Sequence, residues 1–155
     1  MRAITALFLS LLLSAPVFAQ DAEEANAPEV MEEPTLLIVE AEDVTLEQYL
    51  WISRPLVVFA DSPLDPRFEE QIELLLADAE ELMIRDVVVI TDTCPEDCSG
   101  FREKLRPRGF ALVLIGKDGQ VKLRKPSPWD VREITHAIDK WPIRLKEIRD
   151  AQGKE

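Results

Sequence analysis

Residues 55–66, Pro-Leu-Val-Val-Phe-Ala-Asp-Ser-Pro-Leu-Asp-Pro, join two elements of different kinds. Leu56 to Ala60 form an unbroken apolar run between a proline and an aspartate. This pattern is typical of a strand buried on both faces in a parallel sheet. Ser62-Pro63 and Asp65-Pro66 each place a capping residue before a proline, and both pairs are typical helix starts. The stretch therefore predicts a buried strand that leads directly into a helix.

Helical and strand patterns alternate downstream of this stretch. One helix face is expected to pack, because apolar residues recur at helical spacing. These residues are Phe68, Ile72, Leu75, Ala79 and Leu82. Apolar runs predict strands over residues 87–90 and 110–115, and a short helix is expected over 99–105.

The last third of the chain predicts a hairpin followed by two helices. Lys117-Asp118-Gly119 is typical of a hairpin turn, and Val121 to Arg124 alternate as on a strand with one solvated face. Residues 131–141 carry an apolar helical face, and Pro142 separates them from a polar helix over residues 143–150. Upstream, residues 36–39 predict a strand. Thr45 and Gln48 predict a capping box that opens a short helix through Trp51.

The order of these elements predicts an α/β fold. Two parallel strands joined by a right-handed crossover are followed by a hairpin and a closing helix. This is a βαβαββα core with a mixed sheet, preceded by an N-terminal helix. It is the thioredoxin-like three-layer sandwich, and we expect it to occupy residues 36–150.

Several short stretches carry a more specific resemblance. Residues 108–119, Arg-Gly-Phe-Ala-Leu-Val-Leu-Ile-Gly-Lys-Asp-Gly, resemble the thioredoxin segment that bears the cis-proline and its hairpin. Residues 54–60 with Asp65-Pro66-Arg67, and residues 106–110, are similar to the thioredoxin- and peroxiredoxin-like domain-of-unknown-function family 4174. Its members are small exported bacterial proteins, related to a domain of vertebrate sushi-repeat matrix proteins. The resemblance spans Leu46 to Trp141 and brings no settled activity.

The departures from thioredoxin bear on function. Where the resemblance places Cys-x-x-Cys, residues 61–65 contain no sulfur, and Ala111 stands at the cis-proline position. A thiolate at that helix N-terminus is the nucleophile of the family chemistry. We therefore expect a non-catalytic binding or accessory module whose ligand the sequence does not name. The alternative is a thiol-disulfide or peroxide-linked redox protein that uses Cys94 and Cys98.

Three interpretations of Cys94-Pro95-Glu96-Asp97-Cys98 remain open. The first is a structural disulfide, which would stabilise the loop by about 2 kcal/mol. The second is an exchangeable redox pair, which the surrounding acids disfavour and Arg102, one helical turn away, favours. The third is a metal site, but a structural zinc usually needs four protein ligands, and no histidine is close in sequence. We favour the disulfide and expect no metal and no cofactor.

An anion site is the second candidate. In this fold the loop before the third core strand lies beside the N-terminus of the first core helix. This placement brings together the candidates for binding a carboxylate or phosphate. They are Ser62, Arg67, Arg106, Arg108 and Gly109. The alternative, which we favour, is a structural lock in which Arg106 and Arg108 pair with Asp61 and Asp65.

The N-terminal residues predict export. Residues 1–19 carry Arg2, an apolar run and Val17-Phe18-Ala19, as in a secretory signal peptide cleaved after Ala19. Residues 20–35 read as a flexible acidic linker. We therefore expect a periplasmic or secreted protein in an oxidising compartment, with no membrane span in the mature chain.

Charge and composition exclude several classes of function. The net charge of −12 and the pI near 4.6 argue against nucleic acid as a partner. The partner is expected to be another envelope or secreted protein. His136, the single histidine, lies on a predicted helix with no nucleophile near it in sequence, which disfavours a hydrolase.

Overall fold

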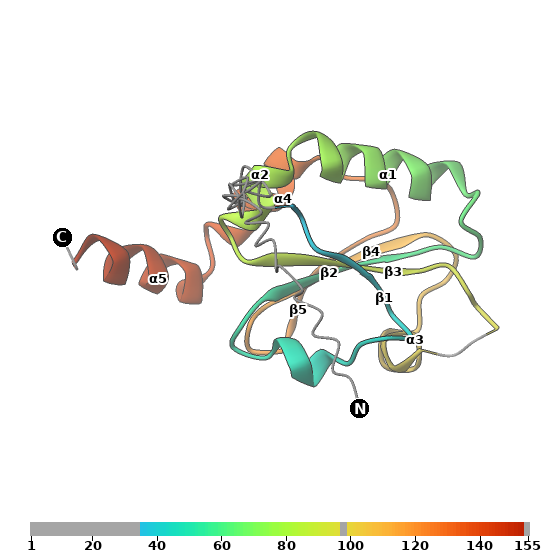
Figure 1. Ribbon diagram of the computed structural model, residues 1–155, viewed down its shortest axis with the longest axis horizontal. Coiled ribbons are helices and arrows are strands. Elements are labelled where there is room, and N and C mark those ends of the chain that lie inside the picture. The colour runs from blue at the N-terminus through green and yellow to red at the C-terminus, as the bar shows by residue number, and fades with distance from the viewer. Residues whose placement is uncertain (1–34, 97–98, 154–155) are drawn as a thin grey trace, which may run out of the picture. The chain divides into compact units, whose positions relative to one another are not determined.

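A five-stranded mixed sheet forms the centre of the domain (Figure 1). The computed structural model of the chain describes residues 35–96 and 99–153. The strand order is β1-β3-β2-β4-β5; β1, β2 and β3 run parallel, and β4 and β5 are antiparallel to their neighbours. The strands are β1 Ile38–Glu40, β2 Arg54–Phe59, β3 Val87–Asp92, β4 Ala111–Ile115 and β5 Val121–Lys125. This arrangement confirms the predicted α/β sandwich.

Helices cover both faces of the sheet (Figure 1). One face carries α1, α2 and α4, and the other carries η1 and α3. The helices are η1 Leu46–Tyr49, α1 Pro66–Ala77, α2 Ala79–Met83, α3 Gly100–Leu105, α4 Val131–Ile138 and α5 Pro142–Gln152. None of the helices in these described ranges is long and apolar enough to cross a membrane.

Two separate cores result from the period-two alternation of strand side chains. In β2, Leu56 and Val58 face the α1–α4 side, whereas Val57 and Phe59 face the α3 side. All four side chains are fully buried. This explains why the run 56–60 carries no polar residue: both faces of the central strand are covered.

Three local predictions were wrong. Strand β2 begins at Arg54, before the expected start, and includes Pro55. This is tolerated because the ladder with β4 reaches only Leu56, so no neighbour there needs the missing proline N–H. The single helix expected over residues 68–82 is two helices, α1 and α2, separated at Asp78. The capping box at Thr45 opens a short 3-10 helix that ends at Tyr49, not at Trp51.

Candidate functional site

The β2–α1 loop lies at the carboxyl ends of the parallel strands. This is the position at which the resemblance to thioredoxin places Cys-x-x-Cys. Of the two predicted helix starts, the second one is used: Asp65 is the N-cap of α1, and its Oδ1 accepts from the N–H of Arg67 at 2.9 Å. Ser62 instead closes the preceding turn, because its Oγ accepts from the N–H of Leu64 at 3.2 Å. The helix start is therefore capped by a carboxylate of the chain itself.

Arg67 reinforces this cap. Its Nε and Nη2 donate to the two carboxylate oxygens of Asp65, at 3.1 and 2.7 Å. The hydrogen bonds from Arg67 hold the pKa of Asp65 below its ordinary value. The guanidinium also lies 5.5 Å from the centroid of the Phe110 ring. Arg67 is thus fixed at the loop with half of its side chain exposed.

The loop before β4 lies beside this helix start, as the sequence predicted. A Cβ added at Gly109 would lie 3.6 Å from Oδ2 of Asp61 and 4.0 Å from Nη2 of Arg67. Gly109 also has a φ of +61°, which favours glycine. Of the five predicted anion-site residues, the structure therefore brings Gly109 and Arg67 together at the β2–α1 loop.

Arg106 and Arg108 point into solvent from the same loop. Both are exposed, and neither side chain forms a hydrogen bond or ion pair with a residue that the structure describes. The alternative in which they lock onto Asp61 and Asp65 was wrong. Asp65 is bound by Arg67, and Oδ1 of Asp61 faces Nη1 of Arg102 at 3.9 Å. Two guanidinium groups without side-chain partners therefore lie in the segment that leads to Gly109.

A buried polar cluster at the same edge was not predicted. Asp92, the last residue of β3, has a side chain only 3% exposed. Its Oδ2 accepts from Oγ of Ser99 at 2.6 Å, and its Oδ1 accepts from Nε and Nη2 of Arg102 at 2.9 and 2.7 Å. Arg102 also donates to the carbonyl of Ala60 at 2.9 Å. The cluster therefore ties α3 to the ends of β2 and β3.

The buried cluster bears on whether Arg102 can favour a thiolate at the cysteines. Cys94 is exposed in the loop after β3, and Cys98 lies outside the described residues, so the disulfide stays a prediction. Arg102 was the group expected to favour a thiolate. Its guanidinium is committed to Asp92, a carboxylate that cancels its charge. Among the described residues, no group of three or more potential ligands lies close enough to hold a metal ion.

The family comparison covers most of the folded domain. The family described as "Domain of unknown function (DUF4174)" matches residues 45–147, from the capping box of η1 into α5. The chain belongs to the DUF4174 family. The match includes the β2–α1 loop, the loop before β4 and the Asp92 cluster of this DUF4174 protein.

Solved structures resemble this DUF4174 chain in fold. A chloroplastic thioredoxin z is similar with a TM-score of 0.53 and 19% identity, covering 70% of this chain and 95% of that one. A reduced 2-Cys peroxiredoxin of Plasmodium vivax has a TM-score of 0.52 and 16% identity, covering 67% and 85% of the two chains. No curated protein matches the sequence. At such identities the likeness concerns the fold alone.

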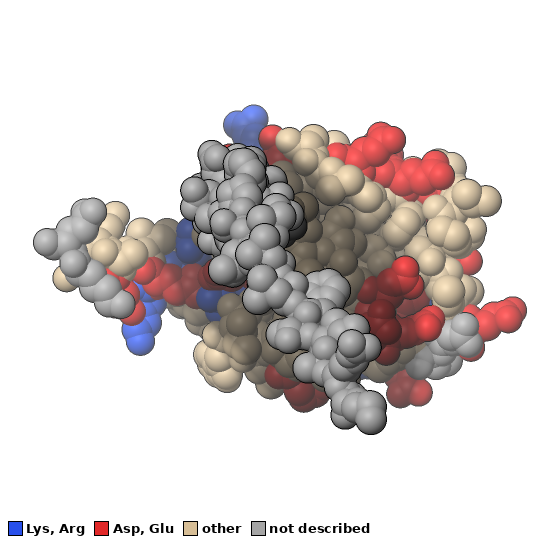
Figure 2. Space-filling model, in the orientation of Figure 1, with Lys and Arg blue, Asp and Glu red and all other residues tan. Residues whose placement is uncertain are grey.

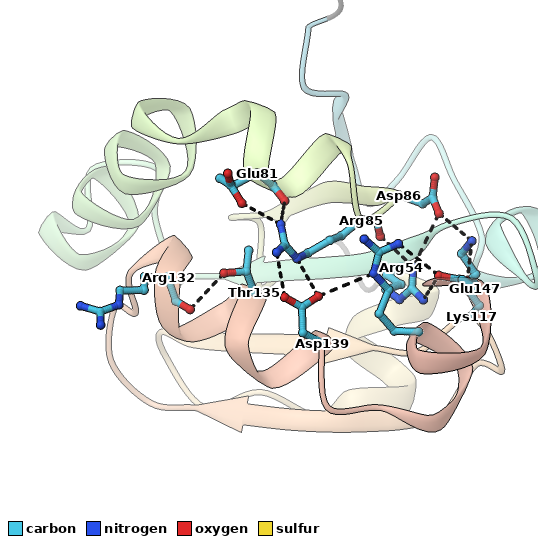
Figure 3. A network of polar contacts seen from close by, with 10 residues as sticks. Arg54, Glu81, Arg85, Asp86, Lys117, Arg132, Thr135, Asp139 and Glu147 are labelled. Atoms are coloured by element: carbon cyan, nitrogen blue, oxygen red, sulfur yellow. Dashed lines mark hydrogen bonds and ion pairs between the residues drawn. The ribbon is translucent and has the colours of Figure 1, made fainter. Parts of the chain in front are cut away.

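The DUF4174 domain has a second polar cluster at the opposite edge of the sheet (Figure 3). Arg54, the first residue of β2, is 1% exposed. Its Nη1 donates to the carbonyl of Arg85 and its Nη2 to Oε2 of Glu147 on α5, both at 2.8 Å. Lys117 bridges Asp86 and Glu147 at 2.7 and 3.1 Å. The cluster links the start of the central strand to the last helix.

The charges in this second cluster are mutually compensated. Burial alone would raise the pKa of Glu147, but hydrogen bonds from Arg54 and Lys117 outweigh it, so that the pKa of this carboxyl lies below its ordinary value. Hydrogen bonds from Arg85 likewise lower the pKa of Asp139, which Arg85 contacts with both Nε and Nη2 at 2.9 and 2.8 Å. Sequence reasoning missed these pairs, although Arg54 directly before an apolar run was a usable signal.

Proposed function

We propose that this protein is an exported, non-catalytic binding module that uses the thioredoxin fold to present arginines to an anionic group of a partner. The observation that carries the proposal is the pair of exposed, unpaired arginines, Arg106 and Arg108, beside a helix start that holds no sulfur. A guanidinium recognises carboxylate or phosphate oxygens with two parallel hydrogen bonds. Because Arg106 and Arg108 are exposed and only two positions apart, both guanidinium groups are available to one anionic group of a partner.

The neighbouring groups support a binding role over a catalytic one. Asp65 and Arg67 occupy the helix start with a fixed pair of hydrogen bonds. The Asp92 carboxylate is buried, with both its oxygens bonded. The corner therefore supplies recognition groups on a rigid base, which favours binding of an anion that arrives with its partner protein.

A titration with inorganic phosphate and with acetate tests this function. We expect either anion to shift the amide NMR resonances of Arg108 and Gly109 in a saturable way. The double variant Arg106→Ala/Arg108→Ala should lose the effect. The matched control, Lys104→Ala/Lys140→Ala, removes two positive charges from exposed sites elsewhere and should retain it. An equal loss in both variants would show general charge attraction and contradict a site.

The second candidate function is thiol-disulfide exchange. It is favoured by the exposure of Cys94 beside the end of β3, because an exchange reaction needs an accessible sulfur. The electrons would pass from a dithiol substrate to the Cys94–Cys98 disulfide, leaving two thiols on this chain and a disulfide on the substrate.

Equilibration in glutathione buffers separates the two functions. A reversible potential between about −120 and −270 mV would place the pair among exchange catalysts. A disulfide that resists reduction below about −300 mV would mark a structural bridge and leave the binding function in place.

Export is part of the proposal. It rests on the signal-like residues 1–19 and the acidic residues 20–35. Sequencing the N-terminus of the protein recovered outside the cytoplasm should find Gln20 first. Recovery of the chain with Met1 intact and only inside the cell would reject export.

A further inference from the structure

Strand β5 forms one of the two edges of the sheet. In the strand order β1-β3-β2-β4-β5, only β4 pairs with it among the residues that the structure describes. None of the residues of β5, Val121–Lys125, is buried, whereas every residue of β4 is. An edge strand leaves the N–H and C=O groups of its outer side without a strand partner. β5 therefore offers main-chain hydrogen bonds to one more strand.

The side chains of β5 make this edge cationic. Lys122, Arg124 and Lys125 account for three of its five residues, and the strand contains no acid. Carboxylates, by contrast, are spread over much of the face of the domain that Figure 2 shows, and the whole chain has a net charge of −12. Lys122 is paired with Asp118 at 2.7 Å. The charges available to a partner are therefore those of Arg124 and Lys125.

Arg124 and Lys125 are held in place without a carboxylate. Nη2 of Arg124 donates to the carbonyl oxygen of Leu105, the last residue of α3, at 2.8 Å. Nζ of Lys125 lies 4.1 Å from the centroid of the Trp129 ring. Neither side chain forms an ion pair with a carboxylate in the described part of the chain. Both charges are thus positioned but not neutralised.

The two cations lie on opposite faces of the strand, because successive side chains alternate. Arg124 is opposite Val113, which belongs to the core on the α3 side. Lys125 is opposite Leu112, which belongs to the core on the α1–α4 side, and Trp129 packs against that same core. An added strand would therefore meet one cation on each of its faces, at adjacent positions.

These cations determine which strand the edge can accept. A second copy of β5 would place lysine and arginine against lysine and arginine, and like charges across a strand pair are destabilising. Carboxylates opposite Arg124 and Lys125 would instead form cross-strand ion pairs, which stabilise the pairing. The charge pattern therefore selects an acidic segment over another copy of this chain.

We propose that β5 accepts an extended acidic segment of a partner protein as a sixth strand. The main chain of the segment extends the sheet, and two adjacent glutamates or aspartates pair with Arg124 and Lys125. Such docking takes affinity from the main chain and specificity from the side chains. The inference goes beyond anion recognition at Arg106 and Arg108, because pairing along β5 requires an extended backbone as well as a charge.

A blocked peptide, acetyl-Thr-Val-Glu-Glu-Val-Thr-amide, titrated into the full chain and followed by NMR, tests the proposal. We expect saturable shifts of the Arg124 and Lys125 amides, and slower amide exchange in β5 as its outer N–H groups become hydrogen-bonded. Arg124→Gln/Lys125→Gln should weaken binding about tenfold. The matched control, Arg132→Gln/Arg149→Gln, removes two exposed cations from α4 and α5 and should bind with an unchanged Kd.

Modified peptides separate strand addition from general charge attraction. The peptide with both glutamates replaced by glutamine should bind about tenfold more weakly. Of two peptides N-methylated on alternate residues, the one methylated on the edge that faces β5 should lose binding, and the other should keep it. Equal affinity of these two peptides, or an equal loss in the two double variants, would overturn the proposal. Shifts confined to Arg108 and Gly109, and abolished by Arg106→Ala/Arg108→Ala, would overturn it while supporting the proposed function, so the two ideas fail separately.

Discussion

Arg102 and Asp92 form the buried ion pair on which the carboxyl edge of the sheet depends. Arg102→Met leaves the Asp92 carboxylate buried with Ser99 as its remaining side-chain donor. Removing one partner of a buried pair costs about 3–5 kcal/mol of unfolding free energy, and we expect that loss in urea unfolding. The control Arg108→Met alters an exposed, unpaired arginine and should stay within about 0.5 kcal/mol of the wild type. A loss below about 1 kcal/mol in Arg102→Met would contradict the pairing.

Glu147 makes stability depend on pH with a defined sign. Its pKa is lowered in the folded protein from an ordinary value of 4.5. The stabilisation is therefore fully present above that ordinary value and is lost as the pH falls through the lowered folded value. Glu147→Gln should cost about 1.5 kcal/mol at pH 7, and the difference from wild type should shrink on acidification. A difference that stays constant from pH 7 to pH 3 would contradict this assignment.

These residue-scale features were the least predictable from the sequence. Arg54 lies next to an apolar run, but arginine is mostly exposed in proteins, and its partner Glu147 is 93 positions away. No local pattern reports a contact over that distance. The capping box at Thr45 and the N-cap at Asp65 were predictable because both use hydrogen bonds within three residues.

At the scale of elements, α5 differs from every other helix of the domain described here. It buries no side chain, and its contacts to the sheet edge include the ion pairs of Glu147 with Arg54 and Lys117. We expect amide hydrogens of α5 to exchange much faster than those of α4, which buries Val131, Ile134 and Ile138. Near 1 M salt, where the screening length falls to about 3 Å, exchange in α5 should rise further and exchange in α4 should not. Equal protection of α4 and α5 against amide exchange would contradict the idea that ion pairs hold α5 to the domain.

The element order was predictable because each buried strand is a short apolar run between turn residues. The run 87–90 and the run 110–115 correspond to β3 and β4. The break at Asp78 was missed because the apolar spacing continues through it from Leu75 to Leu82, both fully buried. A continuous apolar face can be shared by two short helices, and periodicity alone does not show the change of axis.

At the scale of the whole molecule, one sheet serves two cores. Val113 contributes to the α3 side and Leu114 to the α1–α4 side, and both are fully buried. Because both cores need the same strands, we expect a single cooperative unfolding transition. Leu114→Ala should cost about 2–5 kcal/mol. It should lower the urea midpoint equally for far-UV dichroism and for tryptophan fluorescence, to which Trp129 and Trp141 beside one core and the exposed Trp51 contribute. Different urea midpoints for fluorescence and dichroism would contradict a single cooperative transition of the two cores.

The prediction of the fold was confirmed, whereas the anion site stays a prediction. The strand pattern determines which face each residue takes, so the sandwich follows from spacing. The fold also indicated which segments meet: Gly109, in the loop before β4, lies beside Asp61 and Arg67. The pairing of arginines with carboxylates depends on how far each side chain extends, which the sequence pattern does not show. Asp65 forms its ion pair with Arg67 and not with Arg108.

The link between Arg54 and Glu147 also sets an order of events during synthesis. The ribosome makes β2 before α5, so the central strand exists before Glu147 does. Until Glu147 emerges, the guanidinium of Arg54 has only the longer ion pair with Asp86, at 3.6 Å, instead of the 2.8 Å pair with Glu147, and burying an incompletely paired charge is unfavourable. Stable burial of Arg54 would therefore wait until α5 has been made. A nascent chain stalled after Lys140 should then remain open to protease within β2, whereas the released full chain should resist cleavage.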